Sequence, residues 1–322
     1  MKTFRLPGTT LDATVVAHGC WAAGGLWWGD DVDDDASIAA MRAAYDAGVR
    51  LFDTAPLYGH GHADRLLARA LGDRLSEVVV ATKVGVRWDG DGAHAESDLS
   101  PDHVRADIDA SLQRLGLQTL PLLQIHWPCQ RGTPLEVTLE ALFEQVRAGK
   151  VQAVGLCNYD AAQVRVAREA FPIVSLQTPY SMLRRELEGP LETAAHTPPP
   201  GLAVLAYEPL CRGLLTGSKS ATTRYPDSDL RARDDRFVGK RYLRALTLTS
   251  RLTLLARRVG VPTAALALAW ALRQPAVDIV IAGAKRAAQV AENVQAAALL
   301  ESTAADEAFW AEVDRIAAAW HG

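Results

Sequence analysis

The sequence predicts an α/β fold, a (β/α)8 TIM barrel. Eight short apolar segments alternate with helix-like segments from Val15 to Leu299. Most of the eight are apolar without interruption, as expected of strands that are buried on both faces of a parallel sheet. The 322 residues suffice for a barrel, which commonly occupies about 250 residues as one domain. We therefore expect residues 1–322 to form a single barrel domain, with a short N-terminal hairpin and a C-terminal helix.

The predicted strands are spaced so that a helix fits between successive strands, which is the pattern of βαβ units in a parallel sheet. They cover Val15–His18, Arg50–Asp53, Glu77–Thr82, Leu120–Ile125, Val151–Leu156, Ile173–Leu176, Ala203–Ala206 and Asp278–Ile281. No linker interrupts this alternation in a way that would divide the chain into two domains.

Sequence signals mark where two of the helices begin and end. Ser100 and Pro101 predict one start, because serine is a favoured N-cap and proline fits the first helical turn. Gly116 predicts the end of that helix. The motif TPLE at 133–136 predicts a capping box at the start of the next helix, which Gly149 closes.

Five further segments carry weaker signals of local structure. Residues 1–14 resemble a small polar hairpin that could plug the barrel bottom, and the acidic run Asp30–Asp35 resembles a solvated loop that caps a helix. The long charged stretch 217–240 is typical of a functional lid or a disordered loop. The Pro-rich HTPPPG at 196–201 predicts an extended connection. An amphipathic helix is expected around Ala304–Trp320.

Composition and charge exclude several classes of function. The net charge is −4 and no basic stripe occurs, so nucleic acid is not an expected partner. The four cysteines lie far apart and form no CxxC motif, which suits a reducing cytosol. The N-terminus lacks the apolar core of a signal peptide, and no apolar run reaches the roughly 20 residues that cross a membrane. We expect a soluble cytoplasmic protein without a membrane partner.

Four polar residues that could do chemistry stand where predicted strands end. Asp53 closes the second strand, Tyr58 lies in the loop that follows, and Lys83 and His126 come after the third and fourth strands. In a (β/α)8 barrel the C-terminal strand ends meet at the mouth, where active sites are built. We therefore expect the four side chains to converge at one site.

The chemistry of these groups indicates roles for them. A phenol has a pKa of about 10, and we expect the ammonium of Lys83 to lower the pKa of Tyr58, with Asp53 holding Lys83 in place. His126 would hydrogen-bond a substrate oxygen or transfer a proton, so the group would polarise a carbonyl and protonate its oxygen. Taken singly, Asp53 could instead cap a helix or form a structural ion pair, Lys83 could be solvated, and His126 could be a core histidine.

Several motifs, in the same order, resemble those of one enzyme family. They are LFDTAPLYG (51–59), the lysine after VVVAT (78–82), QIHWP (124–128), GKVQAVGLCNYD (149–160), YSML (180–183), AYEPLCRGLLTG (206–217) and IAGAKRAAQVAENVQA (281–296). Together they are similar to the aldo-keto reductase superfamily over nearly the whole chain. The resemblance implies an NADP-dependent oxidoreductase on a metal-free barrel, with Asp53, Tyr58, Lys83 and His126 as its catalytic tetrad. It implies reversible hydride transfer between nicotinamide and an aldehyde, a ketone, or a sugar lactol or alcohol, with Tyr58 as general acid and base.

The sequence contains no GxGxxG motif between a strand and a helix, so no Rossmann fingerprint supports dinucleotide binding. The family resemblance implies instead that NADPH or NADP+ lies extended across the barrel mouth. By this resemblance, Asn158 and Gln177 hydrogen-bond the nicotinamide carboxamide and Tyr207 stacks on its ring. The residues that it implies at the pyrophosphate and the adenosine are Leu210, Arg212, Gly213 and Leu215, then Gly283, Lys285, Arg286, Gln289, Glu292 and Asn293.

Lys285 and Arg286 stand at the start of a predicted helix, which is a favourable place for a 2′-phosphate. We expect NADPH to be preferred, with NADH or NAD+ as the alternative cofactor. Two residues nearby depart from the family pattern. Cys157 replaces a common serine and would give only a weak hydrogen bond to the carboxamide. Glu208 would repel the pyrophosphate unless it is turned away or paired with Arg212.

Five tryptophans fall in predicted loops at the strand ends. Side chains this large are seldom all exposed, so most are expected to be buried or to line a pocket. We expect Trp21, Trp88 and Trp127 to face a small-molecule carbonyl or sugar substrate; the other two are Trp27 and Trp28. The sequence does not specify an oligomeric state.

Two other functions are compatible with parts of the sequence. His60, His62 and Asp64 form an H-x-H-x-D pattern of the kind that metal-dependent barrel hydrolases use. In those barrels the pair follows the first strand, whereas here it follows the second, so we expect a helix-entry loop and no metal. Asp64 also stands where the reductase motif often has glutamate. An NADPH-binding regulatory subunit with vestigial turnover is the second alternative, which the complete tetrad disfavours.

Overall fold

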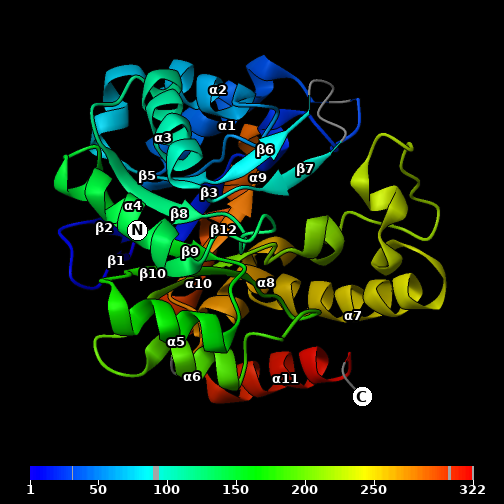
Figure 1. The fold of residues 1–322 in the computed structure, drawn as a ribbon. Helices are drawn as coiled ribbons and strands as arrows, with labels where there is room; N and C mark the ends of the chain where they lie inside the picture. Colours follow the sequence, from blue (N-terminus) through cyan, green and yellow to red (C-terminus); the bar gives the residue numbers. More distant parts are fainter. Residues whose placement is uncertain (31, 90–93, 304–305, 321–322) are drawn as a thin grey trace.

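Eight parallel strands close into a barrel in the computed structural model, which describes residues 1–30, 32–89, 94–303 and 306–320 (Figure 1). The strands follow chain order around the barrel, and β12 closes it by pairing with β3. They are β3 (Val16–Gly19), β4 (Leu51–Asp53), β5 (Val79–Val84), β8 (Leu120–Ile125), β9 (Val151–Cys157), β10 (Ser175–Pro179), β11 (Ala203–Tyr207) and β12 (Ile279–Gly283). The predicted TIM barrel is confirmed.

All eight predicted strands are observed, and their ends move by only a few residues. The shift that matters for the site is in β5, which continues to Val84 instead of ending at Thr82. Lys83 therefore lies inside the strand and not after it. The strand is longer than predicted because Lys83 and Val84 still pair with Gln124 and Ile125 of β8.

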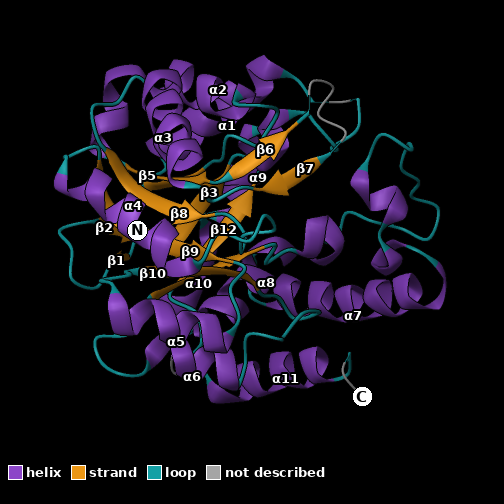
Figure 2. Ribbon diagram, in the orientation of Figure 1, coloured by secondary structure: helices purple, strands orange, loops and turns teal. Residues whose placement is uncertain are grey.

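Helices cover the outside of the barrel and connect its strands (Figure 2). They are α1 (Asp34–Asp46), α2 (His62–Leu71), α3 (Pro101–Leu115), α4 (Leu135–Arg147), α5 (Ala161–Ala170), α6 (Pro190–His196), α7 (Gly239–Arg258), α8 (Thr263–Arg273), α9 (Ala287–Asn293), α10 (Gln295–Ser302) and α11 (Glu307–Ala318). Short 3-10 helices are η1 (Trp21–Gly24), η2 (Gly72–Glu77), η3 (Cys211–Thr216), η4 (Leu230–Arg233) and η5 (Asp235–Phe237). No single helix among the described residues is long and apolar enough to cross a membrane.

The predicted starts of α3 and α4 are close to correct, but both predicted side-chain caps are wrong. Ser100 occupies the N-cap position of α3, yet its side chain makes no capping hydrogen bond. The capping box at 133–136 is absent because Pro134 holds the N-cap position of α4, and proline has no side-chain group that could cap. The predicted end of α3 is confirmed by Gly116, whose φ of 68° suits a residue without a Cβ.

A small hairpin closes the bottom of the barrel, as predicted for residues 1–14. Its strands β1 (Thr3–Arg5) and β2 (Asp12–Thr14) are antiparallel. Leu6 and Leu11 are buried and pack in one cluster with Leu51, Leu122 and other inward-facing barrel residues. The lower half of the barrel is thus filled with apolar side chains.

The weaker local predictions have mixed outcomes. Asp33, in the acidic run, accepts a hydrogen bond from the backbone N–H of Ala36 at 2.6 Å and caps α1, as expected. The connection at 196–201 bends at residues 197–200 and does not run extended, because Arg168 gathers several of its carbonyl oxygens around one guanidinium. The C-terminal helix begins at Glu307, later than predicted, and residues 304–305 lie outside the described residues.

Two segments stand beyond the barrel on the same side of the molecule (Figure 1). One is a second hairpin formed by β6 (Val86–Trp88) and β7 (Ala95–Ser97), in the loop after Lys83. The other is the long charged stretch 217–240, which contains η4 and η5. The stretch 217–240 therefore has defined structure instead of being disordered.

Candidate active site

The four residues of the predicted tetrad meet at the mouth of the barrel. Asp53 ends β4 and Lys83 lies in the neighbouring strand β5, while His126 follows β8. Lys83 Nζ lies 2.8 and 2.9 Å from the two carboxylate oxygens of Asp53 and 3.1 Å from the hydroxyl of Tyr58. All four side chains are buried or nearly so, and the ammonium joins the carboxylate and the phenol in one group.

Burial sets the protonation of this group. Removal from water raises the pKa of Tyr58 well above its usual value, and the charge of Asp53 raises it further. The expected lowering by Lys83 is therefore wrong, because the ammonium is shared with a carboxylate that acts in the opposite direction. Burial also holds the pKa of His126 well below its usual value, with Lys83 adding to the effect. At neutral pH, Tyr58 is a protonated phenol and His126 a neutral imidazole.

Gln177 connects the tetrad to the next layer of residues in the barrel. Its Nε2 donates to Asp53 Oδ1 at 2.8 Å, so this carboxylate oxygen accepts from both Gln177 and Lys83. Its Oε1 accepts a weak hydrogen bond from the thiol of Cys157 at 3.6 Å. Burial raises the pKa of Cys157 to about 12, so this thiol keeps its proton and can donate.

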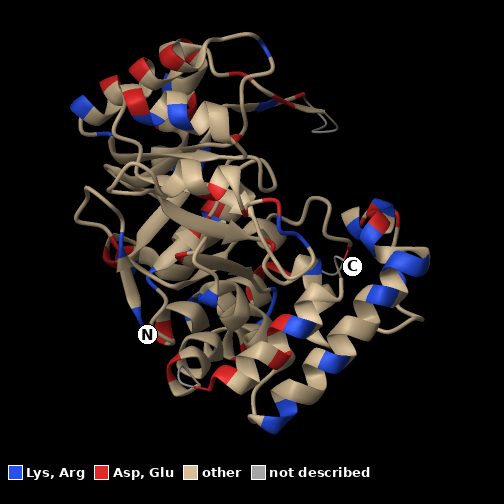
Figure 3. Cartoon of the chain, turned by 90° about the horizontal axis from the view of Figure 1, so that it is seen from below, with Lys and Arg blue, Asp and Glu red and all other residues tan. Residues whose placement is uncertain are grey.

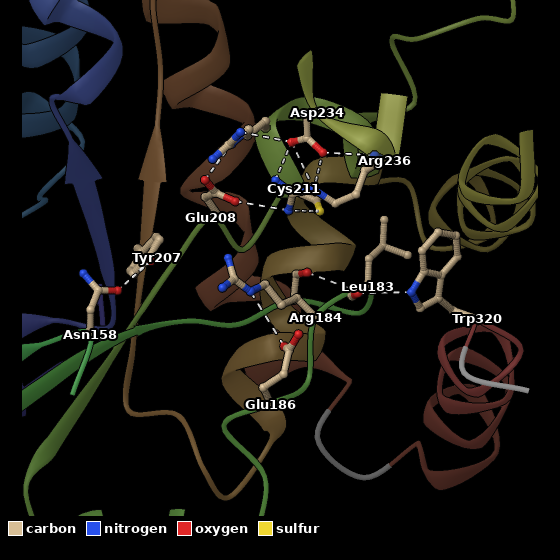
Figure 4. Close-up of polar contacts among 12 residues, drawn as sticks. Asn158, Leu183, Arg184, Glu186, Tyr207, Glu208, Cys211, Asp234, Arg236 and Trp320 are labelled. Atoms are coloured by element: carbon tan, nitrogen blue, oxygen red, sulfur yellow. Dashed lines mark hydrogen bonds and ion pairs between the residues drawn. The ribbon is translucent and has the colours of Figure 1, made fainter. Parts of the chain in front are cut away.

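Asn158 links His126 to Tyr207 through both ends of its amide. Its Nδ2 donates to the backbone carbonyl of His126 at 2.9 Å, and its Oδ1 accepts from the hydroxyl of Tyr207 at 2.8 Å (Figure 4). The three residues expected at the nicotinamide, namely Asn158, Gln177 and Tyr207, are thus held in place by bonds within the protein.

A cavity of about 1210 Å³ lies over the tetrad and extends along the barrel mouth. It exceeds the roughly 300–1,000 Å³ of most ligand pockets, so it has room for a ligand of more than ordinary size. Of the residues predicted to bind the cofactor, twelve line it: Asn158, Gln177, Tyr207, Leu210, Arg212, Gly213, Gly283, Lys285, Arg286, Gln289, Glu292 and Asn293. Leu215, the remaining one, is fully buried in η3 and is not among the described residues of the lining.

The tryptophans predicted at the substrate side fall into two groups. Trp21 and Trp127 line the cavity, and the Trp21 ring stacks 6.1 Å from the ring of Tyr58. Trp88 is not among the described residues of the lining. It lies in β6 and stacks on His60, with ring centroids 4.8 Å apart. The structure therefore brings two of the three indoles to the tetrad.

Strained backbone surrounds the cavity. In η3 the consecutive residues Cys211, Arg212 and Gly213 have φ values of 50°, 55° and 94°, all in the left-handed region, and they interrupt the helix with a kink. Such conformations are costly for residues with a Cβ and persist where the surrounding structure fixes them, often at functional sites. Of the six described non-glycine residues with positive φ, four line the cavity: Trp27, Asn158, Glu208 and Arg212.

Two carboxylates and two guanidinium groups tie this loop to η5 (Figure 4). Arg212 donates to Glu208 at 2.6 Å and to Asp234 at 3.0 Å. Arg236 donates to the same two carboxylates, at 3.2 and 2.5 Å. Glu208 is thus paired with Arg212, which is one of the two arrangements expected to remove its repulsion of a pyrophosphate.

The stretch 217–240 also crosses to the loop that follows β3. Trp28 and Asp229 form an isolated antiparallel bridge. The guanidinium of Arg231 lies over two rings, 5.3 Å from that of Trp28 and 4.2 Å from that of Tyr225. Lys285 Nζ donates to the backbone carbonyl of Trp28 at 2.9 Å. Three distant parts of the chain therefore form one roof at the cavity, which we define as Trp28, Tyr225, Asp229, Arg231 and Lys285.

The H-x-H-x-D residues do not converge. His62 Nε2 lies 2.7 Å from Asp34 of α1, and the carboxylate of Asp64 accepts from the guanidinium of Arg114 at 2.9 Å. His60 stacks on an indole instead. Within the part of the chain that the structure describes, no group of three His, Cys, Asp or Glu side chains could hold a metal ion.

Comparison with known protein families agrees with this geometry. The model of the Aldo/keto reductase family matches residues 15–317. The chain belongs to the aldo-keto reductase family. It is therefore an oxidoreductase of a family that uses nicotinamide cofactors.

Relatives of this aldo-keto reductase are named for different activities or for the family alone. An aldo-keto reductase YhdN from Bacillus subtilis is 32% identical over 293 residues, covering 90% of this chain and 87% of the relative. An NADH-specific methylglyoxal reductase from Escherichia coli is 32% identical over 308 residues, covering 92% and 93%. Among solved structures, a glycerol dehydrogenase from Gluconobacter oxydans superposes with a TM-score of 0.83 at 35% identity, covering 91% of this chain and 89% of that one.

The cavity of this aldo-keto reductase fits a nicotinamide cofactor on chemical grounds. Trp28 Nε1 and Tyr225 Oη are buried in cavity-lining residues and have no hydrogen-bond partner within the described protein. Buried polar atoms normally have partners, so these two leave donors for a polar ligand. Lys285 and Arg286 add positive charge at the far end of the cavity, where a phosphate would be favoured.

Sequence reasoning missed most of the roof. Tyr225, Asp229 and Arg231 belong to a stretch that is predicted as a functional lid or a disordered loop, with no single residue of it assigned to the pocket. One signal was present: the stretch contains two Asp-x-Arg patterns, at 229–231 and 234–236. In both, the aspartate accepts from the arginine side chain two residues later.

We expect Gly24→Ala to destabilise the fold. A Cβ at residue 24 would lie 2.6 Å from the backbone carbon of Tyr58 and 2.8 Å from the backbone nitrogen of Gly59, so the tetrad loop would have to move. Overpacking of this kind costs about 1–3 kcal/mol. Urea unfolding monitored by circular dichroism measures the change in the free energy of unfolding.

Gly283→Ala is the matched control. A Cβ there would meet only the backbone oxygen of Gly19, at 3.7 Å, and its φ is not in the left-handed region. Its free energy of unfolding should stay within about 0.5 kcal/mol of the wild type. Equal stability of both variants would contradict the tight contact at Gly24.

Proposed function

We propose that this protein is an NADPH-dependent reductase that transfers hydride reversibly between the nicotinamide and the carbonyl carbon of a small aldehyde or ketone, with Tyr58 as general acid and base. The observation that carries the proposal is the 3.1 Å contact between the ammonium of Lys83 and the hydroxyl of Tyr58. Tyr58 keeps its proton at neutral pH and can donate it as charge develops on a substrate oxygen. In the oxidative direction the substrate is an alcohol or a sugar lactol.

The chain's own residues have distinct tasks in this proposal. The neutral imidazole of His126 hydrogen-bonds the substrate oxygen and orients it toward Tyr58. Lys83 stabilises the negative charge that forms on Tyr58 as its proton leaves. Asp53 holds the ammonium at the correct position through two short bonds. The cofactor, when bound, supplies or accepts the hydride.

The residues that would hold the cofactor follow the length of the cavity. Asn158, Gln177 and Tyr207 would contact the nicotinamide, and their bonds within the protein support a fixed orientation. Backbone N–H groups of the η3 loop would bind the pyrophosphate, since turns of this kind present several N–H groups to an anion. Residues at 283–293 would hold the adenosine end.

The lining beside Tyr58 supports a small substrate with polar oxygens. Trp21 and Trp127 form apolar walls, while Tyr58 and His126 supply the polar groups. The relatives named for methylglyoxal and glycerol handle compounds of this kind. We propose small oxygenated aldehydes, ketones and the corresponding polyols as the substrate class.

The adenosine end supports NADPH over NADH. Arg286 is exposed at the start of α9, and no carboxylate pairs with its guanidinium among the described residues. Lys285 is instead bound to the backbone of Trp28. Arg286 is thus the cation that we propose for the 2′-phosphate, because guanidinium and phosphate form strong charge-assisted hydrogen bonds.

We expect Tyr58→Phe to lower kcat for carbonyl reduction by about 100- to 10,000-fold, the usual contribution of a general acid. Loss of NADPH absorbance with an activated aromatic aldehyde measures it, run beside NADH. Fluorescence titration should give a Kd for NADPH within about twofold of the wild type, because the missing hydroxyl is not a proposed cofactor contact.

A near-normal kcat in Tyr58→Phe would remove the proposed role of the phenol. Tight NADPH binding with no turnover by the wild-type protein on aldehydes, ketones and polyols would favour the regulatory alternative. A wild-type preference for NADH would overturn the proposed cofactor while leaving the chemistry intact.

The two reaction directions should depend on pH with opposite sign. Reduction needs protonated Tyr58, whose pKa lies well above its usual value, so kcat/KM for reduction should stay level from pH 6 to 9 and fall only at higher pH. Oxidation needs the deprotonated form and should rise with pH throughout. The low pKa of His126 predicts no inflection near pH 6.5. An inflection in the reduction profile near pH 7 would contradict both assignments.

Arg286→Ala should lower kcat/KM for NADPH by about tenfold or more, since a hydrogen bond to a charged group contributes about 1.5–3 kcal/mol. kcat/KM for NADH should not change, because NADH has no 2′-phosphate. Arg65→Ala, which removes an exposed arginine of α2, is the control for net charge. Equal losses for both cofactors would place the phosphate elsewhere.

A further inference from the structure

Helix α7 is strongly basic in a chain of net charge −4. Its sequence GKRYLRALTLTSRLTLLARR contains six Lys or Arg and no Asp or Glu. In Figure 3 the basic positions form a series of blue bands along this helix, with no red between them. Exposed apolar side chains gather at the same place: of six large ones among the described residues, three are Val238, Leu243 and Leu254.

These side chains form two parallel rows on the outer face of α7. The basic row is Lys240, Arg244 and Arg251, and the second row is Leu243, Thr247 and Leu254. Both rows repeat the same spacing of four and then seven residues, which keeps each on one side of a helix. Leu243 and Leu254 are 52% and 62% exposed, so the second row projects into solvent.

A groove of about 510 Å³ runs beside the basic row, between α7 and α11. Leu248, Ile316 and Trp320 contribute its apolar surface. The indole of Trp320 is fixed because its Nε1 donates to the backbone carbonyl of Leu183 at 3.1 Å (Figure 4). Arg244 donates to the backbone carbonyl of Trp320 at 2.9 Å, which joins the two walls. The groove is therefore a preformed feature.

The two outer members of the basic row form no ion pair with a carboxylate of the described residues. Elsewhere on α7, Arg241 pairs with Asp235 and Arg258 with Glu312. Lys240 and Arg251 have no carboxylate partner within the described parts of the chain. They stand about 16 Å apart along the helix at 1.5 Å per residue, one toward each end of the groove. The groove thus presents apolar surface between two positive charges that no carboxylate of the described residues neutralises.

We propose that the α7–α11 groove binds an acidic amphipathic helix of a partner protein. Such a helix would carry carboxylates in one row and apolar residues in a second row, at the same spacing as the two rows of α7. Its carboxylates would pair with the basic row, and its apolar side chains would contact Leu243 and Leu254. A second copy docking by the same face would oppose like charges. A flat lipid surface would not reach the apolar surface inside the groove. This inference is independent of the proposed redox reaction.

The test uses a synthetic 18-residue helical peptide, labelled with fluorescein, that carries three Glu and three Leu in the two-row spacing. Anisotropy should show binding to the whole protein, and a peptide with Gln in place of each Glu should bind at least tenfold more weakly. Lys240→Glu/Arg251→Glu should also weaken binding at least tenfold. Arg65→Glu/Arg257→Glu changes the net charge equally and should stay within twofold of the wild type.

Several results would overturn the proposal. One is equal weakening in both double variants, which would mean non-specific attraction, and another is no binding of the acidic peptide. Binding to phosphatidylserine vesicles without binding to the peptide would assign α7 to a membrane surface. Concentration-dependent self-association that Lys240→Glu/Arg251→Glu abolishes would assign it to a second copy. If that variant does not fold, Leu243→Asn tests the apolar row, and it should weaken peptide binding at unchanged circular dichroism.

Discussion

The buried ion pair between Lys83 and Asp53 is the constraint on which the site depends. Both side chains are almost fully removed from water, where an unpaired charge would cost several kcal/mol. The structure offsets that cost by giving both charged groups hydrogen-bond partners. The ammonium contacts two carboxylate oxygens, the carbonyl of Thr54 and the hydroxyl of Tyr58. The carboxylate also accepts a hydrogen bond from Gln177. These partners come from β4, β5, β10 and one loop, so only a closed barrel brings them together. Closure of the sheet thus brings Gln177 of β10 to the ion pair between the neighbouring strands β4 and β5.

A second set of ionic contacts holds the upper part of the cavity. Arg212 and Arg236 share the carboxylates of Glu208 and Asp234, and this network joins the strained η3 loop to η5. The roof then continues the connection through Arg231 to Trp28 and on to Lys285. The η3 loop, which we propose for a cofactor pyrophosphate, is therefore not fixed by its own short-range bonds alone. It depends on a segment more than twenty residues further along the chain.

The parts of the structure that sequence reasoning found are those with a local signal. Short apolar runs, most of them uninterrupted, identified all eight strands, and position relative to those runs brought Asp53, Tyr58, Lys83 and His126 to one mouth. The wrong predictions are of two kinds. Some concern the exact capping residue of a helix, as at Ser100 and at 133–136. Others concern contacts between residues that are far apart in sequence. Nothing near Lys285 in sequence indicates that its ammonium binds the carbonyl of Trp28. The pKa of Tyr58 was predicted in the wrong direction because burial and the charge of Asp53 are properties of the assembled barrel.

The two ends of the barrel differ in what their side chains do, because the N-terminal hairpin closes only the bottom. At the bottom, Leu6 and Leu11 complete an apolar filling with Leu51 and Leu122, and no polar chemistry depends on those residues. At the mouth, strained turns and desolvated charges lower the free energy of unfolding, whereas the apolar filling at the bottom raises it. Substitutions of cavity-lining side chains in the loops at 21–28 or 217–240, such as Trp21 or Tyr225, leave the apolar filling at the bottom in place. Leu6, Leu11, Leu51 and Leu122 are not among the described residues that line the cavity, so the floor of the barrel can be kept while the cavity lining changes.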